Sequence, residues 1–151
     1  MHRHELIPRL ERTPLFAQFG RDEISALIDY VTVLTAAKGA TIFREGERSA
    51  HVCLLLEGKL EVKKDGGDGA VKKIADIQVG KTIGEMSVID GMPYSATVVA
   101  AEDSILVLMS RDNLMRICEE RPRIGNRLLW QLATMVSLRL RQTTGKLLDH
   151  L

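Results

Sequence analysis

The chain has 151 residues, of which 45% are hydrophobic and 27% are charged, and its formal net charge at pH 7 is +1. That length fits a single domain, residues 1–151, and the near-neutral charge gives no overall reason to expect nucleic acid or a membrane as partner. Two cysteines are too few for a disulfide framework or a zinc site, no stretch approaches the roughly 18 apolar residues of a membrane span, and the N-terminus lacks a signal-peptide pattern, so we expect a cytoplasmic protein without a metal.

The first 30 residues carry helical patterns. Residues 5–15 are interrupted by Pro8 and Pro14, which predicts a short helix or arm, broken at these prolines, that ends before the second one. After Gly20, acidic residues precede apolar residues at spacings of three and four, which predicts an amphipathic helix docked on the rest of the chain. The apolar positions are Ile24, Leu27, Ile28 and Val31.

From residue 31 to residue 109 the pattern changes to short runs of β-type residues separated by turns that contain glycine. Seven runs have the length of strands. They are residues 31–35, 41–43, 52–56, 60–63, 71–79, 97–101 and 105–108. Many short strands must hide their edges, so we expect a closed or double-layer antiparallel structure, a jelly roll or small barrel.

The chain returns to helix at Ser110, which is a good N-cap, and Pro122 ends this helix and fits the first turn of the next. We expect the last helix to run from about Arg123 to His150, with an interruption at Gly145. It carries two apolar stripes. The first contains Leu128, Leu132, Met135 and Leu138, and the second contains Leu129, Ala133, Val136, Leu140, Thr143 and Leu147. Two stripes predict two partners, the barrel and the same helix of a second copy, although burial of both stripes within one domain is the alternative.

Residues 84–98 are the most informative run. Gly84 and Glu85 open it, a Gly-Met-Pro sequence interrupts it, and small and β-branched residues close it, which is typical of a ligand-binding loop that re-enters a sheet. This run resembles the phosphate-binding cassette of the cyclic nucleotide-binding domains of catabolite-activator-type regulators, kinase regulatory subunits and nucleotide-gated channels. Residues 38–47 and 52–62 resemble the early strand, turn and hairpin of the same family, so the resemblance covers roughly residues 14–148.

The resemblance implies a mainly β fold with flanking helices (α+β), built on a double-stranded β-helix or jelly-roll barrel. N-terminal helices would occupy residues 1–30, the barrel residues 31–109, and the C-terminal helices residues 110–151. A cyclic nucleotide would be the ligand, no cofactor would be required, and the output would pass through the C-terminal helix of a homodimer.

The resemblance also implies roles for single residues. Glu85 would accept a hydrogen bond from the ribose 2′-hydroxyl, and Gly84 would leave room for the sugar. Backbone N–H groups around Ser87 and the Ser95 hydroxyl would bind the phosphate. A hydroxyl pair that follows Arg139-Leu140 would contact the base, although threonines in a helix seam are the alternative. The candidate ligand-binding residues are Gly84, Glu85, Met86, Ser87, Tyr94, Ser95, Ala96, Thr143 and Thr144.

Tyr94 departs from the family pattern, which has an arginine nine residues after the glutamate. Arginine would clamp the phosphate with two charge-assisted hydrogen bonds, whereas tyrosine supplies one neutral O–H. The exchange should cost roughly 1–2 kcal/mol, or about a ten- to thirtyfold loss of affinity at least. The pocket would then bind a cyclic nucleotide weakly, use another cation such as Arg44 or Lys81, or bind something else or nothing.

We therefore expect a non-enzymatic regulatory module that senses cAMP, cGMP or a related small anion and signals through its C-terminal helix. The alternative is a degenerate, ligand-free dimerisation or interaction domain of the same fold. An enzyme is disfavoured because a metal-dependent barrel would need several histidines, and only His51 lies in the barrel region. Residues 121–151 are basic, but the family reads DNA with a later helix-turn-helix and this sequence stops at Leu151, so we expect no direct nucleic-acid binding and no membrane partner.

Overall fold

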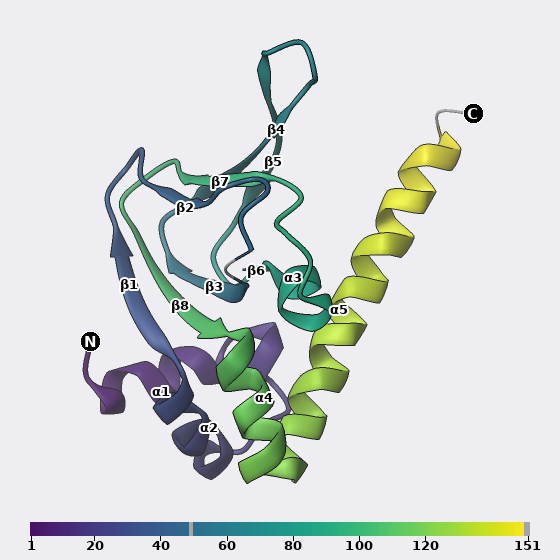
Figure 1. The fold of residues 1–151 in the computed structure, drawn as a ribbon. Helices are drawn as coiled ribbons and strands as arrows, with labels where there is room; N and C mark the ends of the chain where they lie inside the picture. The colour runs from purple at the N-terminus through teal and green to yellow at the C-terminus, as the bar shows by residue number, and fades with distance from the viewer. Residues whose placement is uncertain (49, 150–151) are drawn as a thin grey trace.

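The computed structural model describes residues 1–48 and 50–149. Within these residues eight strands form two four-stranded antiparallel sheets, with strand orders β1-β8-β3-β6 and β2-β7-β4-β5. Figure 1 shows the N-terminal helices and α4 gathered below one end of the two sheets, while α5 runs along their side and the β4–β5 hairpin projects from the opposite end. The predicted jelly-roll class with flanking helices is confirmed.

The strands follow the predicted runs closely. Their bounds are β1 (Thr32–Ala36), β2 (Thr41–Phe43), β3 (His51–Glu57), β4 (Leu60–Asp65), β5 (Val71–Ile77), β6 (Thr82–Ile83), β7 (Thr97–Ala100) and β8 (Ser104–Ser110). Seven of them overlap the predicted runs. The exception is β6, whose two residues pair with Cys53 and Leu54 of β3. Two residues are too few to show a periodic pattern, so this strand was not predicted.

Helices flank the sheets on both sides of the strand region in sequence. Their bounds are α1 (Arg3–Glu11), η1 (Pro14–Phe16), α2 (Arg21–Leu27), η2 (Ile28–Tyr30), α3 (Glu85–Asp90), α4 (Arg111–Glu120) and α5 (Pro122–Asp149), where η marks a 3-10 helix. The Ser110 hydroxyl accepts a hydrogen bond from the Asn113 N–H at 3.1 Å, which confirms the predicted N-cap of α4. Pro122 is the first residue of α5, also as predicted.

The first predicted helix ends before Pro14, as expected, because α1 stops at Glu11, but the two breaks predicted inside helices are wrong. Helix α1 continues through Pro8, because burial of Leu6 and Leu10 on the core offsets the hydrogen bond that a proline cannot donate. Helix α5 continues through Gly145, because one glycine costs only about 1 kcal/mol relative to alanine. The predicted end of the last helix at His150 lies outside the described residues.

Strand β3 separates two apolar cores, and its alternating side chains serve both. Val52, Leu54 and Leu56 face the helices, where they pack with residues from α1, α2, α4 and α5. Cys53 and Leu55 face the barrel interior, where they pack with residues from the second sheet. Because both faces are covered, the strand reads as one continuous apolar run rather than an alternating pattern.

Among the described residues, the apolar packing of helix α5 against the domain is confined to its first part. Leu128 and Leu132 are 1% and 0% exposed, whereas Leu140 and Leu147 are 64% and 63% exposed. Leu138, which was predicted to lie on the packed stripe, is 56% exposed. Each three-residue step turns an α-helix by about 300°, so a stripe extended in steps of three drifts off the packed face.

Helices α4 and α5 approach each other at backbone distance. A Cβ atom added to Gly125 of α5 would lie 2.6 Å from the Cα atom and 2.9 Å from the backbone nitrogen of Cys118 in α4. No side chain larger than hydrogen fits there without moving a helix. None of the helices in the described part of the chain combines the length and the apolar character that a bilayer crossing requires.

Candidate functional site

The candidate site is built around the turn that starts α3. Gly84 precedes this helix with φ of 84°, in the left-handed region that favours glycine. A Cβ atom there would lie 2.3 Å from the His51 carbonyl oxygen and 3.2 Å from the Phe43 ring. Both the backbone conformation and close packing against β3 therefore require glycine. The turn places Glu85, the next residue, at the first position of α3.

Glu85 is 2% exposed, and both of its carboxylate oxygens have partners. The Thr82 hydroxyl donates to Oε1 at 2.6 Å, and Nη1 of Arg139 donates to Oε2 at 3.0 Å. Nη2 of Arg139 also donates to the Thr82 carbonyl oxygen at 2.9 Å. These three residues, which we call the Glu85–Arg139 junction, connect β6 and α3 to the second half of α5.

Tyr94 lies in the barrel interior and is 6% exposed. Its ring stacks on Phe43 with centroids 4.2 Å apart, and its hydroxyl oxygen accepts a hydrogen bond from the His51 N–H at 2.7 Å. Burial raises the pKa of the Tyr94 hydroxyl above its usual value, so this group carries no charge near neutral pH. The side chain fills space in the barrel and contributes no cation to it.

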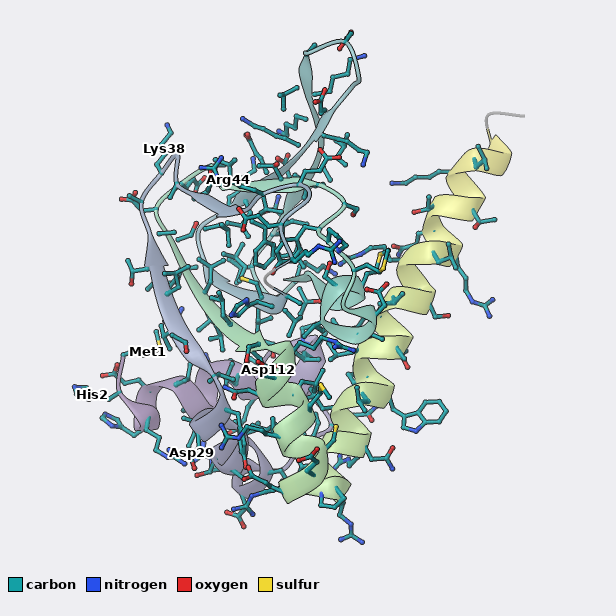
Figure 2. The ribbon with its side chains drawn as sticks, viewed as in Figure 1. Met1, His2, Asp29, Lys38, Arg44 and Asp112 are labelled. Carbon is teal, nitrogen blue, oxygen red and sulfur yellow. The ribbon has the colours of Figure 1, made fainter. Side chains whose placement is uncertain are left out.

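Neither cation suggested by the sequence forms a hydrogen bond or ion pair with Tyr94 in the described part of the chain. Arg44 pairs with Glu47 at 3.7 Å and its side chain is 69% exposed, and Figure 2 shows it on the barrel, well away from Asp112 at the start of α4. Lys81 is exposed. Lys64 instead donates to the Ser95 carbonyl oxygen at 2.6 Å and to Glu45 at 3.2 Å. Sequence reasoning missed Lys64, because nothing distinguishes it from the other lysines of its hairpin.

The remaining candidates fall into two groups. Ser87 is buried in α3 beside Glu85, whereas Met86 is 54% exposed and Ser95 is exposed. Ala96 is half-buried. Thr143 and Thr144 are both exposed, and the Thr143 hydroxyl donates to the Arg139 carbonyl oxygen at 3.0 Å. Within residues 1–48 and 50–149, no hydrogen bond joins either threonine to α3 or to the barrel.

Arg139 and Thr82 are the partners of Glu85 that sequence reasoning did not identify. One signal for Arg139 was available. Leu128 and Leu132 are buried and Met135 is half-buried. These three follow each other at spacings of four and three, and Arg139 is four residues further along the same face. A charged residue in a packed stripe indicates a buried counter-charge on the facing element.

The site holds no metal cluster or reactive thiol in the described residues. No group of three or more His, Cys, Asp or Glu side chains there could hold a metal ion. Cys53 is fully buried, and burial, with a smaller contribution from the Glu85 charge, raises the pKa of its thiol far above the usual value. Burial also raises the pKa of Cys118. Cys53 therefore acts as a small core residue rather than as a nucleophile.

Comparison with known proteins gives consistent relatives. The family model of the cyclic nucleotide-binding domain matches residues 33–121. The CRP-like cAMP-activated global transcriptional regulator of Mycobacterium tuberculosis is 28% identical over 140 residues, which cover 93% of this chain and 61% of the relative. The chain thus spans about three fifths of the length of such curated relatives.

Two solved structures have the same fold over most of the chain. A cyclic nucleotide-binding domain from Methylobacillus flagellatus is 30% identical with a TM-score of 0.85, covering 98% of this chain and 83% of that one. The catabolite activator protein of Thermus thermophilus is 26% identical with a TM-score of 0.79, covering 89% of this chain and 62% of that one.

Proposed function

Because the chain belongs to the cyclic nucleotide-binding domain family, we propose that it is a non-enzymatic regulatory module that senses a cyclic nucleotide, cAMP or cGMP, or a related small anion, and signals through α5. One observation carries the proposal. Glu85, the acceptor expected for a ribose hydroxyl, is held by Arg139 of α5. Ligand binding at Glu85 and the position of α5 are therefore linked through one side chain.

The chemistry of the Glu85–Arg139 junction suggests how the link works. The carboxylate accepts one hydrogen bond on each oxygen and has further lone pairs, but at 2% exposure it has no open approach. A ribose hydroxyl that reaches Glu85 must therefore displace Arg139 or Thr82 from the carboxylate. The ligand thereby changes how firmly the second half of α5 is held, which is the differential contact that a conformational signal requires.

Tyr94 would bind the phosphate of a ligand more weakly than an arginine would. Tyr94 offers no positive charge, and its hydroxyl already accepts from the His51 N–H. We expect cyclic nucleotides to bind about ten- to thirtyfold less tightly than they would with an arginine at this position. Adenosine has the ribose but no phosphate. The difference in affinity between cAMP and adenosine should therefore be smaller here than in a pocket where an arginine clamps the phosphate.

Isothermal titration calorimetry tests the proposal directly. The protein is unfolded and refolded to remove any carried ligand, then titrated with cAMP, cGMP and adenosine at low and moderate salt. We expect saturable binding of at least one of them, and a loss of about tenfold or more for Glu85→Gln, which weakens the acceptor. Asp90→Asn, at the other end of α3, is the matched control and should bind like the wild type.

Tyr94→Arg measures how far the pocket has diverged. The new guanidinium should raise cAMP affinity by at least about tenfold. Because the residue lies in the barrel interior against Phe43, the ligand-free variant should also be less stable. Tyr94→Phe controls for loss of the hydroxyl and should give no such gain. Unchanged cAMP affinity in a folded Tyr94→Arg variant would mean that more than one residue separates this pocket from a phosphate site.

A second candidate function, favoured by the Tyr94–Phe43 stack inside the barrel, is a ligand-free interaction or dimerisation domain. In that case the barrel is a scaffold whose interior is already filled. Absence of heat up to millimolar concentrations of all three ligands would favour this candidate over the sensor. The free cysteines Cys53 and Cys118 fit the proposed cytoplasmic location of either one.

We also propose that two copies associate through the second stripe of α5. Its outer residues Leu140 and Leu147 are mostly exposed, and Val136 is half-buried. Val136→Glu or Leu140→Glu should give a monomer in sedimentation velocity, because each places a charge in the seam. Leu138→Glu changes a leucine on another face of α5 that is 56% exposed, against 64% for Leu140, and should leave the dimer intact. Identical sedimentation of all three variants and the wild type would contradict the seam.

A further inference from the structure

A hollow lies outside the barrel, between α3, α4 and α5. Its volume is about 290 Å³, and its apolar lining comes from all three helices. The apolar residues are Val88, Ile89, Leu114, Met115 and Leu129. We call this hollow the α3–α4–α5 groove. It has no residue in common with the Glu85–Arg139 junction.

The groove leaves large apolar side chains in contact with water. Met115 is 50% exposed, Ile89 is 38% exposed and Leu129 is 37% exposed. Scattered single apolar residues are normal on a protein surface, but three that line one hollow mark a place where another molecule binds. Methionine at the centre favours such contacts, because its flexible side chain adapts to the shape of a partner.

Two opposite charges bracket the apolar lining. Arg111, Met115 and Glu119 follow each other at four-residue spacing on α4, so they share one face, and the two charged residues are about 12 Å apart along the helix. Neither charged residue forms an ion pair within the part of the chain that the structure describes. The groove therefore has a positive end, an apolar middle and a negative end.

Arg111 is the clearer of the two signals. Its Nε atom is buried and has no hydrogen-bond partner among the described residues. Its Nη2 atom makes only a long contact, 3.5 Å, with the Ile89 carbonyl oxygen. Buried donors in folded proteins are almost always satisfied, so an unpaired guanidinium nitrogen in a residue that lines a hollow indicates a missing acceptor.

We propose that the α3–α4–α5 groove binds a short amphipathic helix of a partner protein. Apolar side chains spaced by three and four residues would enter the middle of the groove. A carboxylate on the partner would pair with Arg111, and a basic residue about two turns away would pair with Glu119. The charge pattern thus fixes both the chemistry of the partner and its orientation along α4.

A second copy of α5 fits this charge pattern poorly. Its charged residues from 122 to 148 are all basic, so it offers Glu119 a partner but brings cations to Arg111. They are Arg123, Arg127, Arg139, Arg141 and Lys146. The one acid of α5 is its last residue, Asp149, so a second copy would meet Arg111 with an acid only at the very end of the helix. The groove therefore calls for a segment that carries an acid within its length.

The position of the groove would connect a docked partner to the candidate site. Val88 and Ile89 belong to α3, the helix that begins at Glu85, and Leu129 belongs to α5, which carries Arg139. A partner in the groove would touch both elements that the Glu85–Arg139 junction joins. Docking itself does not depend on which ligand the barrel binds, or on whether it binds one.

Synthetic peptides test the groove with the whole chain. The probe is a fluorescein-labelled helical peptide of about 15 residues, with leucines at spacings of three and four and a glutamate and a lysine eight residues apart. A second peptide carries the glutamate and lysine in reverse order, and a third has glutamine at both positions. Fluorescence anisotropy should show saturable binding of one charged peptide, with the glutamine peptide weaker by about tenfold or more.

Matched variants locate the binding. Met115→Lys and Arg111→Gln should each weaken the charged peptide by about tenfold or more, with Arg111→Gln affecting the glutamine peptide less. Ile74→Lys changes another exposed apolar residue, on β5, and should bind the peptide like the wild type. Arg111 also packs against Gly91, so the melting temperature of its variant is measured alongside. Met115 is half exposed, and its replacement tests the groove without disturbing the core.

Three results would overturn the proposal. The first is no saturable binding of either charged peptide up to millimolar concentration. The second is peptide binding that Met115→Lys leaves unchanged, which would place the peptide elsewhere. The third is a change from dimer to monomer in Met115→Lys, which would mean that a second copy covers the groove. None of these results bears on nucleotide binding measured by calorimetry, so the two proposals fail independently.

Discussion

The two halves of α5 are held to the molecule by different forces. In the first half, Leu128 and Leu132 are almost fully buried on the core, and Arg127 forms an ion pair with Glu23. In the second half, Arg139 donates hydrogen bonds to Glu85 and to the Thr82 carbonyl oxygen, and Leu140 is 64% exposed. Burial is non-directional and tolerates small shifts, whereas a paired guanidinium depends on the position and charge of its partner. The first half is therefore held by burial, whereas the described contacts of the second half depend on the pairing of Arg139 with Glu85.

The largest expected difference between the halves is in apolar packing. Leu132→Ala should lower the free energy of unfolding by about 2–5 kcal/mol, because it leaves a cavity in the core. Leu140→Ala, the same substitution two turns later, should change it by less than about 0.5 kcal/mol when measured at a protein concentration at which the chain sediments as a monomer. Urea denaturation of both variants gives the comparison. Equal losses would mean that the second half is packed as firmly as the first.

A smaller effect is expected at the Glu85–Arg139 junction. Arg139→Met should cost about 1–3 kcal/mol, because it leaves a buried carboxylate with only the Thr82 hydroxyl as partner. Amide hydrogen exchange should speed up in the last turns of α5 and stay unchanged around Leu132. Arg141→Met removes a neighbouring exposed arginine and serves as the control. Faster exchange along the whole helix would show that the two halves are not independent.

The smallest effect concerns the ion pair of the first half. The Gly20 N–H and the Arg127 guanidinium lower the pKa of Glu23 from 4.5. Glu23 therefore binds a proton more readily in the unfolded chain than in the folded one. The ion pair between Glu23 and Arg127 stabilises the fold above pH 4.5, and this contribution is lost as the pH falls through the lower pKa of the folded state. Glu23→Gln should cost less than about 1 kcal/mol at pH 7.

Thermal melting from pH 7 down to acid pH measures this dependence. The difference in melting temperature between wild type and Glu23→Gln should be largest at neutral pH and should shrink below pH 4.5. Asp22→Asn, which changes the adjacent exposed acid, should show a smaller difference. A difference for Glu23→Gln that persists unchanged into strong acid would rule out the ion pair as its cause.

Most of the fold was predictable because its signals are local. Strand runs and glycine turns identified seven of the eight described strands, and Ser110 and Pro122 marked the helix boundaries. The errors at Pro8 and Gly145 have a common cause. Local propensity favoured a break at each residue, but burial in α1 and the length of α5 outweighed it.

The candidate site was predicted less completely, because its key contact is not local. The glycine turn and Glu85 were evident in one short run, but the residue that pairs with Glu85 lies 54 positions later. The place of Tyr94 in the sequence was evident, but the residues that surround it in the fold were not. Only the folded barrel places its hydroxyl against the His51 N–H and its ring on Phe43.

Because Gly125 has no side chain, a substitution there would affect which partners the groove accepts. The close approach of Gly125 to Cys118 sets the separation of α4 and α5 and thereby the width of the α3–α4–α5 groove. Alanine at this position would wedge the two helices apart while every residue that lines the groove stayed the same. A single methyl group that touches no partner would then change the width of the groove, and so decide whether small or large partner side chains fit into it.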